Sequence, residues 1–227
     1  MKLWNDLLHL FFPRLCLLCD EPLVEGERTL CLSCLYSLPR THFHKRSFNP
    51  AEQLFAGKTP VTKATSYLYY EKGGKVQQLI YAIKYRGEKE AGFQMGKLAA
   101  AELYKEDFFE GIDLIIPVPL HPGRQRRRGY NQAECIARGI ASVAQIPVDC
   151  RSLVRKRQTN TQTHKNVFER WTNVQDIFHV NTPQKLTGKH ILLVDDVLTT
   201  GATIEACAQR INAIEGAHIS ILTLSIA

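Results

Sequence analysis

The amino-acid sequence predicts an α/β protein whose main part is a parallel sheet, preceded by a small cysteine-rich module. Segments of strand and helix length alternate from residue 65 onward, which is typical of parallel sheets covered by helices. Residues 191–203, ILLVDDVLTTGAT, read as a buried strand that ends in two carboxylates and a threonine-rich turn. Four of the seven cysteines form two C-x-x-C pairs near the start of the chain. The 44% hydrophobic and 22% charged residues are ordinary for a globular protein.

Hydrophobic periodicity places the elements in order. The strands are expected at 65–70, 114–118, 191–194 and 219–224, and the helices at 76–85, 91–103, 132–144 and 203–215. An arginine-rich loop is expected after the second strand, and a polar, basic stretch before the third. Ligands of parallel sheets bind at the carboxyl ends of the strands, so we expect the functional site where the second and third strands end.

A polar, irregular connector separates two expected parts. Residues 1–45 are expected to hold an amphipathic helix and the cysteine module, and residues 60–227 to form the sheet domain. The apolar residues of the first helix share one face, which favours packing against the module over docking onto a membrane or a partner. His42 and His44, in the connector, are expected in a solvated loop.

The two cysteine pairs have the spacing of a tetrahedral metal site, with eleven residues between them. Each pair forms a tight turn that directs two thiolates at one ion, and four thiolates leave no position for water, so a structural Zn²⁺ site is expected. The expected ligands are Cys16, Cys19, Cys31 and Cys34. A redox dithiol is the alternative, although a single pair suffices for that role. The other three cysteines are expected to be core thiols in a reducing compartment.

The turn after the strand at 191–194 has the features of an anion site. Because it leads into a helix, free backbone N–H groups and the positive end of the helix dipole meet there. The hydroxyl groups of Thr199, Thr200 and Thr203 add donors, and Gly201 lets an anion approach the backbone closely. A phosphate group fits this description. The alternative is an ordinary capped turn, which needs only one such residue.

Asp195 and Asp196 narrow the ligand further. A carboxylate repels a bare phosphate by about 4 kcal/mol at ~4 Å in a partly screened site. The ligand must therefore carry groups that carboxylates bind, such as ribose hydroxyls as donors or Mg²⁺ as a hard cation. A ribose 5-phosphate that bears a metal-bound diphosphate satisfies both halves of the site.

This segment resembles the phosphoribosyl pyrophosphate (PRPP) motif of type I phosphoribosyltransferases: an apolar strand, an acidic pair, two apolar residues and a Thr-Thr-Gly-x-Thr turn. Further segments, in the same order along the chain, resemble the ComF family, also called GntX-like. They are PVPL at 117–120, Arg124, RGYNQ at 128–132, the basic residues 155–162, and Arg170 with Asn173. The cysteine module is similar to that family too, although some relatives carry additional cysteine pairs. The resemblance implies a type I phosphoribosyltransferase-like domain preceded by a zinc-ribbon-like module.

The resemblance also implies roles for individual residues. The acidic pair holds the ribose hydroxyls, and Thr199, Thr200, Gly201, Ala202 and Thr203 hold the 5-phosphate. The residues assigned to the diphosphate or to a closing loop are Arg128, Asn131, Arg155 and Gln162. Arg128 is the first choice, because a guanidinium group binds phosphate oxygens bidentately. Closure of the basic loop excludes water from the oxocarbenium-like state at the anomeric carbon. No residue is identified as a general base.

The net charge of +7 indicates anionic partners. ComF relatives are associated with natural competence, so the resemblance implies a cytoplasmic role in handling single-stranded DNA or in the uptake machinery. The basic clusters suit backbone binding, but no array of aromatic residues is interleaved with them. No stretch has the roughly 20 apolar residues of a membrane span, and no targeting sequence is recognised.

Two classes of function therefore remain. The first is a Mg²⁺-dependent enzyme that transfers phosphoribose from PRPP to an unidentified acceptor. The second is a non-catalytic protein of the same fold that senses PRPP or handles single-stranded DNA, since a fold does not determine its chemistry. Binding of PRPP with Mg²⁺, followed by a test for diphosphate release, separates the two.

Overall fold

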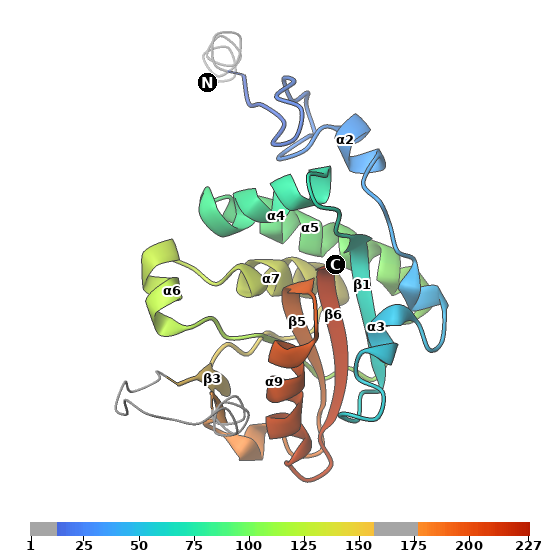
Figure 1. Cartoon of the computed structure of the whole chain (residues 1–227), viewed down its shortest axis with the longest axis vertical. Coiled ribbons are helices and arrows are strands. Elements are labelled where there is room, and N and C mark those ends of the chain that lie inside the picture. Colours follow the sequence, from blue (N-terminus) through green and yellow to red (C-terminus); the bar gives the residue numbers. More distant parts are fainter. Residues whose placement is uncertain (1–12, 157–176) are drawn as a thin grey trace.

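The computed structural model describes residues 13–156 and 177–227, and a parallel sheet of four strands lies at their centre (Figure 1). The strand order is β1-β6-β5-β2. The strands are β1 (Lys63–Tyr69), β2 (Leu114–Pro117), β5 (His190–Leu198) and β6 (His218–Ile226). All pairs in this sheet are parallel, with Ile191 of β5 lying between Leu114 of β2 and Ile219 of β6. The predicted fold class is confirmed.

Helices cover both faces of the sheet (Figure 1). The longer ones are α4 (Lys75–Tyr85), α5 (Lys89–Leu103), α7 (Gln132–Ala144) and α9 (Ala202–Asn212). Helices α4, α5 and α7 share one buried cluster with Leu68, Leu192 and Leu222, whereas α9 shares the other cluster with Leu193 and Ile221. Because neighbouring strand residues point to opposite faces, both faces of β5 are buried, as the apolar run predicts.

The remaining described elements are short. They are α2 (Leu32–Tyr36), α3 (Pro50–Gln53), α6 (Pro122–Arg128), the 3-10 helices Phe43–Lys45, Tyr104–Glu106 and Pro183–Lys185, and the antiparallel strands β3 (Leu153–Arg155) and β4 (Phe178–Val180). Strands β3 and β4 precede and follow residues 157–176. The predicted closing-loop residue Gln162 therefore lies outside the described residues, as does the amphipathic helix expected within 1–12.

Helices α5 and α7 cross closely through two glycines. A Cβ atom added to Gly96 would lie 2.1 Å from the backbone oxygen of Ile136, and one on Gly139 would lie 2.0 Å from that of Phe93. Both distances are far below van der Waals contact, so the two helices pack at this distance only without those side chains. The crossing fixes α7, and Gln132 at its start lines the candidate site described below.

The sequence places the end of the motif strand at Val194, and this boundary is wrong. Strand β5 continues to Leu198, because Asp195 and Val197 still lie beside Thr223 and Ser225 of β6. The acidic pair therefore belongs to the sheet itself. Its backbone is held by strand pairing, which positions the two carboxylates more firmly than a loop would.

The expectation of an arginine-rich loop after β2 is also wrong, because this segment contains helix α6. Pro122 stands in its first turn, and Nδ1 of His121 accepts a hydrogen bond from the Gly123 N–H at 3.1 Å. Gly129, with φ of 81°, ends the helix in the left-handed conformation. Three arginines occupy the last turn, where positive charge complements the helix dipole.

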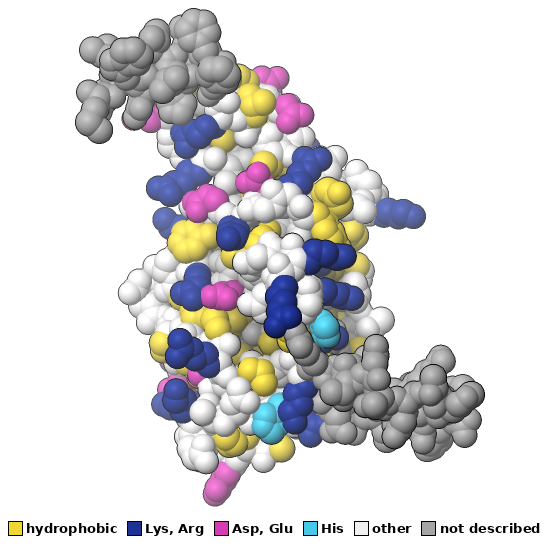
Figure 2. Space-filling view, turned by 90° about the vertical axis from the view of Figure 1, so that its left-hand side faces the viewer, with side chains coloured by type: hydrophobic (Ala, Val, Ile, Leu, Met, Phe, Trp, Pro, Cys, Tyr) yellow, Lys and Arg dark blue, Asp and Glu magenta, His cyan; other side chains and the backbone are white. Residues whose placement is uncertain are grey.

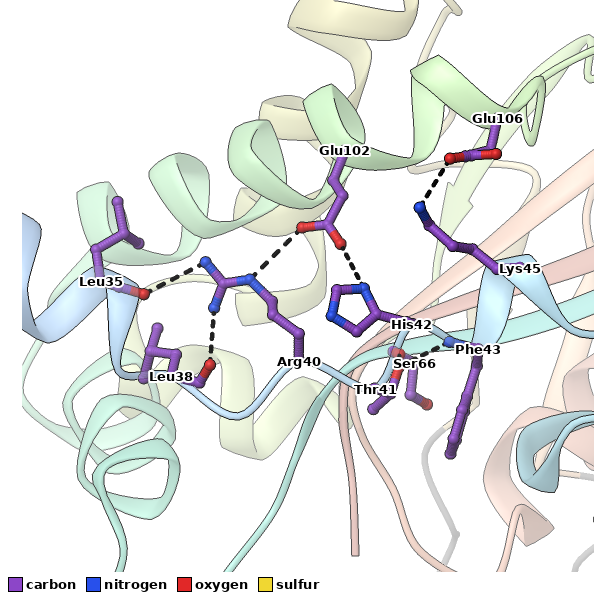
Figure 3. Close-up of polar contacts among 10 residues, drawn as sticks. All are labelled: Leu35, Leu38, Arg40, Thr41, His42, Phe43, Lys45, Ser66, Glu102 and Glu106. Carbon is purple, nitrogen blue, oxygen red and sulfur yellow. Dashed lines mark hydrogen bonds and ion pairs between the residues drawn. The ribbon is translucent and has the colours of Figure 1, made fainter.

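Arg40 ties the connector to its surroundings (Figure 3). Its guanidinium group donates to the backbone oxygens of Leu35 and Leu38, each at 3.3 Å. Its Nε lies 3.5 Å from Oε2 of Glu102 on α5, and its Cζ lies 4.6 Å from the ring centre of Tyr67. One side chain thus joins the end of the cysteine module to a helix and a strand of the sheet domain.

The connector histidines differ from each other. His42 is exposed, and its Nδ1 lies 3.1 Å from Oε1 of Glu102 (Figure 3). His44 is half-buried rather than solvated, and burial lowers its pKa.

The cysteine module shares its core with α4 and α5, since Cys16, Leu30 and Cys34 belong to the same buried cluster. The division into parts at 1–45 and 60–227 stays a prediction.

Candidate active site

A cavity of about 520 Å³ lies at the carboxyl ends of β2 and β5, where the sequence predicts the functional site. Five separate elements contribute a charged side chain or a threonine to its lining. They are Lys84 of α4, Arg124 of α6, Arg155 of β3, Asp195 and Asp196 of β5, and Thr203 of α9. Segments that are far apart in the sequence therefore present two carboxylates, three cationic groups and a hydroxyl to one space.

The turn from β5 to α9 forms one side of this cavity. Thr199 and Thr203 line the cavity, and Thr200 and Ala202 are exposed beside them. Gly201 is the N-cap of α9 with φ of 77°, a conformation that glycine adopts without strain. A Cβ atom there would also lie 3.1 Å from Cε1 of Phe55. The first N–H groups of α9 have no partner within the helix, so the turn can bind an anion.

The acidic pair is largely withdrawn from water. Asp196 is 4% exposed, and its backbone N–H donates to Oδ1 of Asp195 at 2.8 Å. Burial and the neighbouring Asp196 raise the pKa of Asp195 well above its usual value. Among residues 13–156 and 177–227, Oδ2 of Asp196 has no hydrogen-bond partner. A ligand that donates a hydrogen bond would satisfy that oxygen.

Lys84 supplies a positive charge to this pair. Its Nζ lies 2.8 Å from Oδ1 of Asp196, and the two side chains are 23% and 6% exposed. The lysine lies in the last turn of α4, whose buried residues Ile80 and Ile83 hold the helix against the sheet. Lys84 could not be recognised from the sequence, because a lysine on an amphipathic helix gives no local sign of a distant carboxylate partner.

Two arginines line the cavity, Arg155 from β3 and Arg124 from α6. Arg155 is half-buried at the end of β3, its Cζ lies 5.3 Å from the ring centre of Phe178, and desolvation lowers its pKa. Its Nε is buried and has no partner within the described part of the chain. Arg124 of α6 is exposed. Both guanidinium groups can bind phosphate oxygens.

The structure does not bring Arg128 and Asn131 to the lining of this cavity. Arg128 donates to Oε1 of Gln132, and its Cζ lies 5.3 Å from the ring centre of Tyr85. Asn131 is buried and caps α7, since its Oδ1 accepts from the Ala133 N–H at 3.1 Å and its Nδ2 donates to the Val118 oxygen at 3.0 Å. Arg124 therefore lines the cavity, whereas Arg128, at the other end of the same helix α6, does not.

Two exposed tyrosines stand at the mouth of the cavity. Tyr81 and Tyr85 of α4 are 51% and 60% exposed, and their ring centres lie 5.0 Å apart. Arg86 and Arg128 lie near their faces, with Cζ to ring-centre distances of 5.7 and 5.3 Å. The sequence shows no array of aromatic residues interleaved with the basic clusters. The fold brings them together because one turn of helix separates the tyrosines and α6 lies beside α4.

The predicted cysteine ligands form a second candidate site, outside the sheet. The sulfur atoms of Cys16, Cys19, Cys31 and Cys34 all lie within 4.8 Å of one another, a group that can hold a metal ion. Although desolvation opposes ionisation of Cys16, hydrogen bonds from backbone N–H groups, that of Cys31 foremost, lower its pKa to about 7. Because the thiolate is the form that binds metals, this arrangement suits a metal site.

Comparison with known proteins identifies the family. Residues 90–225 match the phosphoribosyl transferase domain family, and this match spans more than half of the chain. The chain belongs to this family. Its relatives include the DNA utilization protein YhgH of Shigella flexneri, which is 29% identical over 214 residues, or 87% of this chain and 90% of that protein. The matched region contains the acidic pair, the turn at 199–203, and the cavity-lining arginines Arg124 and Arg155. Lys84 lies outside it.

Relatives named for competence support the ComF resemblance. Competence protein F of Haemophilus influenzae is 31% identical over 114 residues, half of each chain. Competence protein ComFC of Bacillus subtilis is 23% identical over 143 residues, which cover 62% of this chain and 55% of that protein. The resemblance stated from the sequence is thereby confirmed.

Within the described residues, no helix combines the length and the apolar character needed to cross a membrane.

Proposed function

We propose that this protein binds the magnesium complex of PRPP in the cavity and transfers its phosphoribose group to an acceptor during DNA utilisation. One observation carries the proposal: the acidic pair of β5, the N-terminal turn of α9 and two arginines face the same cavity. Ribose hydroxyls donate to the carboxylates, and the 5-phosphate accepts from the turn. The family match and the names of the relatives support this reading.

The arginines complete the substrate site. Arg124 and Arg155 line the same cavity as Thr199 and Thr203 and bind the diphosphate, because their guanidinium groups remain charged at physiological pH. During transfer, the bond from the anomeric carbon to the diphosphate oxygen breaks, and the acceptor's lone pair forms the new bond. The leaving diphosphate keeps the electron pair, so its negative charge increases. Guanidinium groups and magnesium stabilise that charge.

A binding experiment tests this function. We expect isothermal titration calorimetry to show binding of PRPP with Mg²⁺, and incubation with candidate acceptors to release diphosphate. Nucleobases, nucleotides and single-stranded DNA are the acceptors to test first. Failure of the wild-type protein to bind PRPP would overturn the proposal. Binding without diphosphate release from any acceptor would favour the non-catalytic, PRPP-sensing alternative.

Handling of single-stranded DNA is the second candidate function, and the tyrosines of α4 favour it. Bases stack on exposed aromatic rings while cationic side chains contact the backbone, and Tyr81, Tyr85 and Arg128 provide both kinds of group. Figure 2 shows lysine and arginine side chains along the whole height of the face on which α6 lies, with acidic side chains between them. The charge on this face supports binding of a polyanion.

Salt dependence and competition test the DNA function. We expect weak binding of an oligonucleotide, with an affinity that falls steeply as salt rises. We expect PRPP to compete, because Tyr81 and Tyr85 line the same cavity as Arg124 and Arg155. Tyr85→Ala should weaken DNA binding more than PRPP binding, whereas Tyr104→Ala, an exposed tyrosine on the far end of α5, should change neither. Oligonucleotide binding that ignores both salt and PRPP would show that the basic segments are not a shared site.

The cysteine cluster is proposed to hold a structural zinc ion. Four sulfur donors within 4.8 Å of one another match the tetrahedral, sulfur-rich sets that Zn²⁺ prefers. Two of the four, Cys16 and Cys34, are buried, so the ion would be enclosed by the module. When bound, zinc crosslinks the two C-x-x-C turns and supplies no chemistry to the cavity.

A further inference from the structure

The ion pair between Lys84 and Asp196 has a role that the PRPP motif does not account for. The pair joins the last turn of α4 to the carboxyl-terminal part of β5, and the partners are separated by more than a hundred residues. Asp196 is 6% exposed at its side chain, so its charge is costly to maintain without a nearby cation. The distance of 2.8 Å from Nζ to Oδ1 is that of a charge-assisted hydrogen bond.

The two carboxylate oxygens of Asp196 differ in their hydrogen-bond partners. Oδ1 accepts from Lys84, whereas Oδ2 is buried and lacks a partner in the described part of the chain. Such an oxygen is rare in folded proteins and indicates a missing donor. A ribose hydroxyl that donated to Oδ2 would complete the coordination of this carboxylate without displacing the lysine.

The surrounding charges make Lys84 the nearest cation to Asp196. Asp195 lies next to it on β5, and Arg155 approaches from β3 and Arg124 from α6. Among the described residues, Asp196 forms an ion pair with Lys84 and with no arginine. Without Lys84, the buried carboxylate of Asp196 would lose the donor that fixes the position of Oδ1, and with it the orientation of Oδ2.

We propose that Lys84 is a positioning residue for ribose recognition: it holds Asp196 as an oriented carboxylate whose Oδ2 is left to accept a ribose hydroxyl. This role rests on the proposed function, because it presupposes that PRPP occupies the cavity. Lys84 acts through Asp196 and does not itself contact the phosphates. The ribose site is thus completed by α4, an element outside the motif and outside the residues that match the family.

Three probes distinguish this role from a general effect of charge. PRPP and ribose 5-phosphate contain the ribose hydroxyls, whereas inorganic diphosphate contains only phosphate. We expect Lys84→Met to weaken binding of PRPP and ribose 5-phosphate about tenfold or more, the loss typical of a charged hydrogen bond, and to leave diphosphate binding unchanged. Lys84→Arg should recover most of the affinity, and Lys75→Met, which removes the same charge at the other end of α4, should have no effect.

Lys84→Met leaves the buried carboxylate of Asp196 without its cation, which could destabilise the fold. A double variant avoids this problem, because it replaces Asp196 as well as Lys84. We expect Lys84→Met/Asp196→Asn to bind PRPP as weakly as Asp196→Asn alone, since Lys84 acts only through Asp196. A further loss in the double variant would overturn the proposal, as would equal weakening of diphosphate and PRPP by Lys84→Met. If wild-type protein binds no PRPP, the proposed function itself fails, and the two failures are distinguishable.

Discussion

The four sulfur atoms of the cysteine module lie within 4.8 Å of one another, and all come from one segment of 19 residues, 16–34. The charged side chains of the cavity come instead from four elements, α4, α6, β3 and β5. The regular structure of the module is a five-residue helix, α2, and an isolated bridge between Leu15 and Pro22. The cavity stands on a parallel sheet that is packed on both faces.

This difference in packing predicts different roles for the metal proposed in the module and the PRPP proposed in the cavity. The module buries few side chains of its own, and Leu15, Val24, Leu32 and Tyr36 are exposed, so we expect a bound metal ion to supply much of its stability. The cavity is built on a core that exists without any ligand. We therefore expect loss of the proposed metal to unfold the module, and loss of the proposed substrate to leave the sheet domain folded.

The largest expected effect is on the module. Structural zinc contributes about 10–16 kcal/mol of apparent binding free energy, so Cys31→Ser should release the metal and unfold residues 13–38 while the sheet domain stays folded. Metal analysis and limited proteolysis measure both results. Cys150→Ser, an exposed cysteine outside the cluster, is the matched control and should retain the metal. Purified wild-type protein without stoichiometric zinc under reducing conditions would contradict this prediction.

The next effect is on the cavity and concerns binding rather than folding. Asp196→Asn keeps the size of the side chain but removes the charge that accepts a ribose hydroxyl and pairs with Lys84. A hydrogen bond to a charged acceptor contributes about 1.5–3 kcal/mol, so PRPP affinity should fall about tenfold to a hundredfold. Calorimetry measures the affinity, and thermal unfolding should show little change in Tm. If Tm collapses while PRPP affinity holds, the acidic pair is structural.

A smaller effect is expected at the turn. Thr200 is exposed at the N-terminus of α9, and Thr200→Val removes one phosphate donor while adding a methyl group. PRPP affinity should fall about tenfold, because the backbone N–H groups of the turn remain. Thr187→Val, at an exposed threonine far from the cavity in the fold, is the control. Equal PRPP affinity in wild type and Thr200→Val would place the phosphate elsewhere.

Local patterns in the sequence were enough to predict most of the fold. The helix expected at 132–144 coincides with α7, and the strand expected at 114–118 differs from β2 by one residue. The cysteine cluster was equally predictable, because its spacing lies within one short segment. These features depend on periodicity and spacing, which a single chain segment displays.

Features that depend on distant segments could not be predicted. Lys84 meets Asp196 only after α4 packs on the sheet, and Gly96 and Gly139 meet their neighbours only at the crossing of α5 and α7. Helix α6 was missed because its arginines have no apolar period, and its cap and its terminal Gly129 are the only local signals. Long-range juxtaposition therefore decides the chemistry of the cavity.

The smallest effect is expected at the amino end of the sheet, opposite the cavity. The carboxylate of Asp113 accepts from the His190 N–H at 2.9 Å and lies 3.3 Å from Nζ of Lys189, so its partners belong to the protein. The His190 N–H, with Lys189 assisting, lowers the pKa of Asp113. Asp113→Asn should therefore cost stability, by about 1 kcal/mol or less because the side chain is exposed, and should leave PRPP affinity unchanged.

The sign of the pH dependence follows from the lowered pKa of Asp113. A carboxylate of this kind stabilises the folded state above its unfolded pKa of about 3.9, and that contribution is lost as pH falls through the folded value. The difference in Tm between wild type and Asp113→Asn should thus be present at pH 7 and shrink in acid below about pH 4. Thermal unfolding at both pH values measures it. Weaker PRPP binding in Asp113→Asn than in wild type would contradict this prediction, because Asp113, unlike Asp196, is expected to have no part in ligand binding.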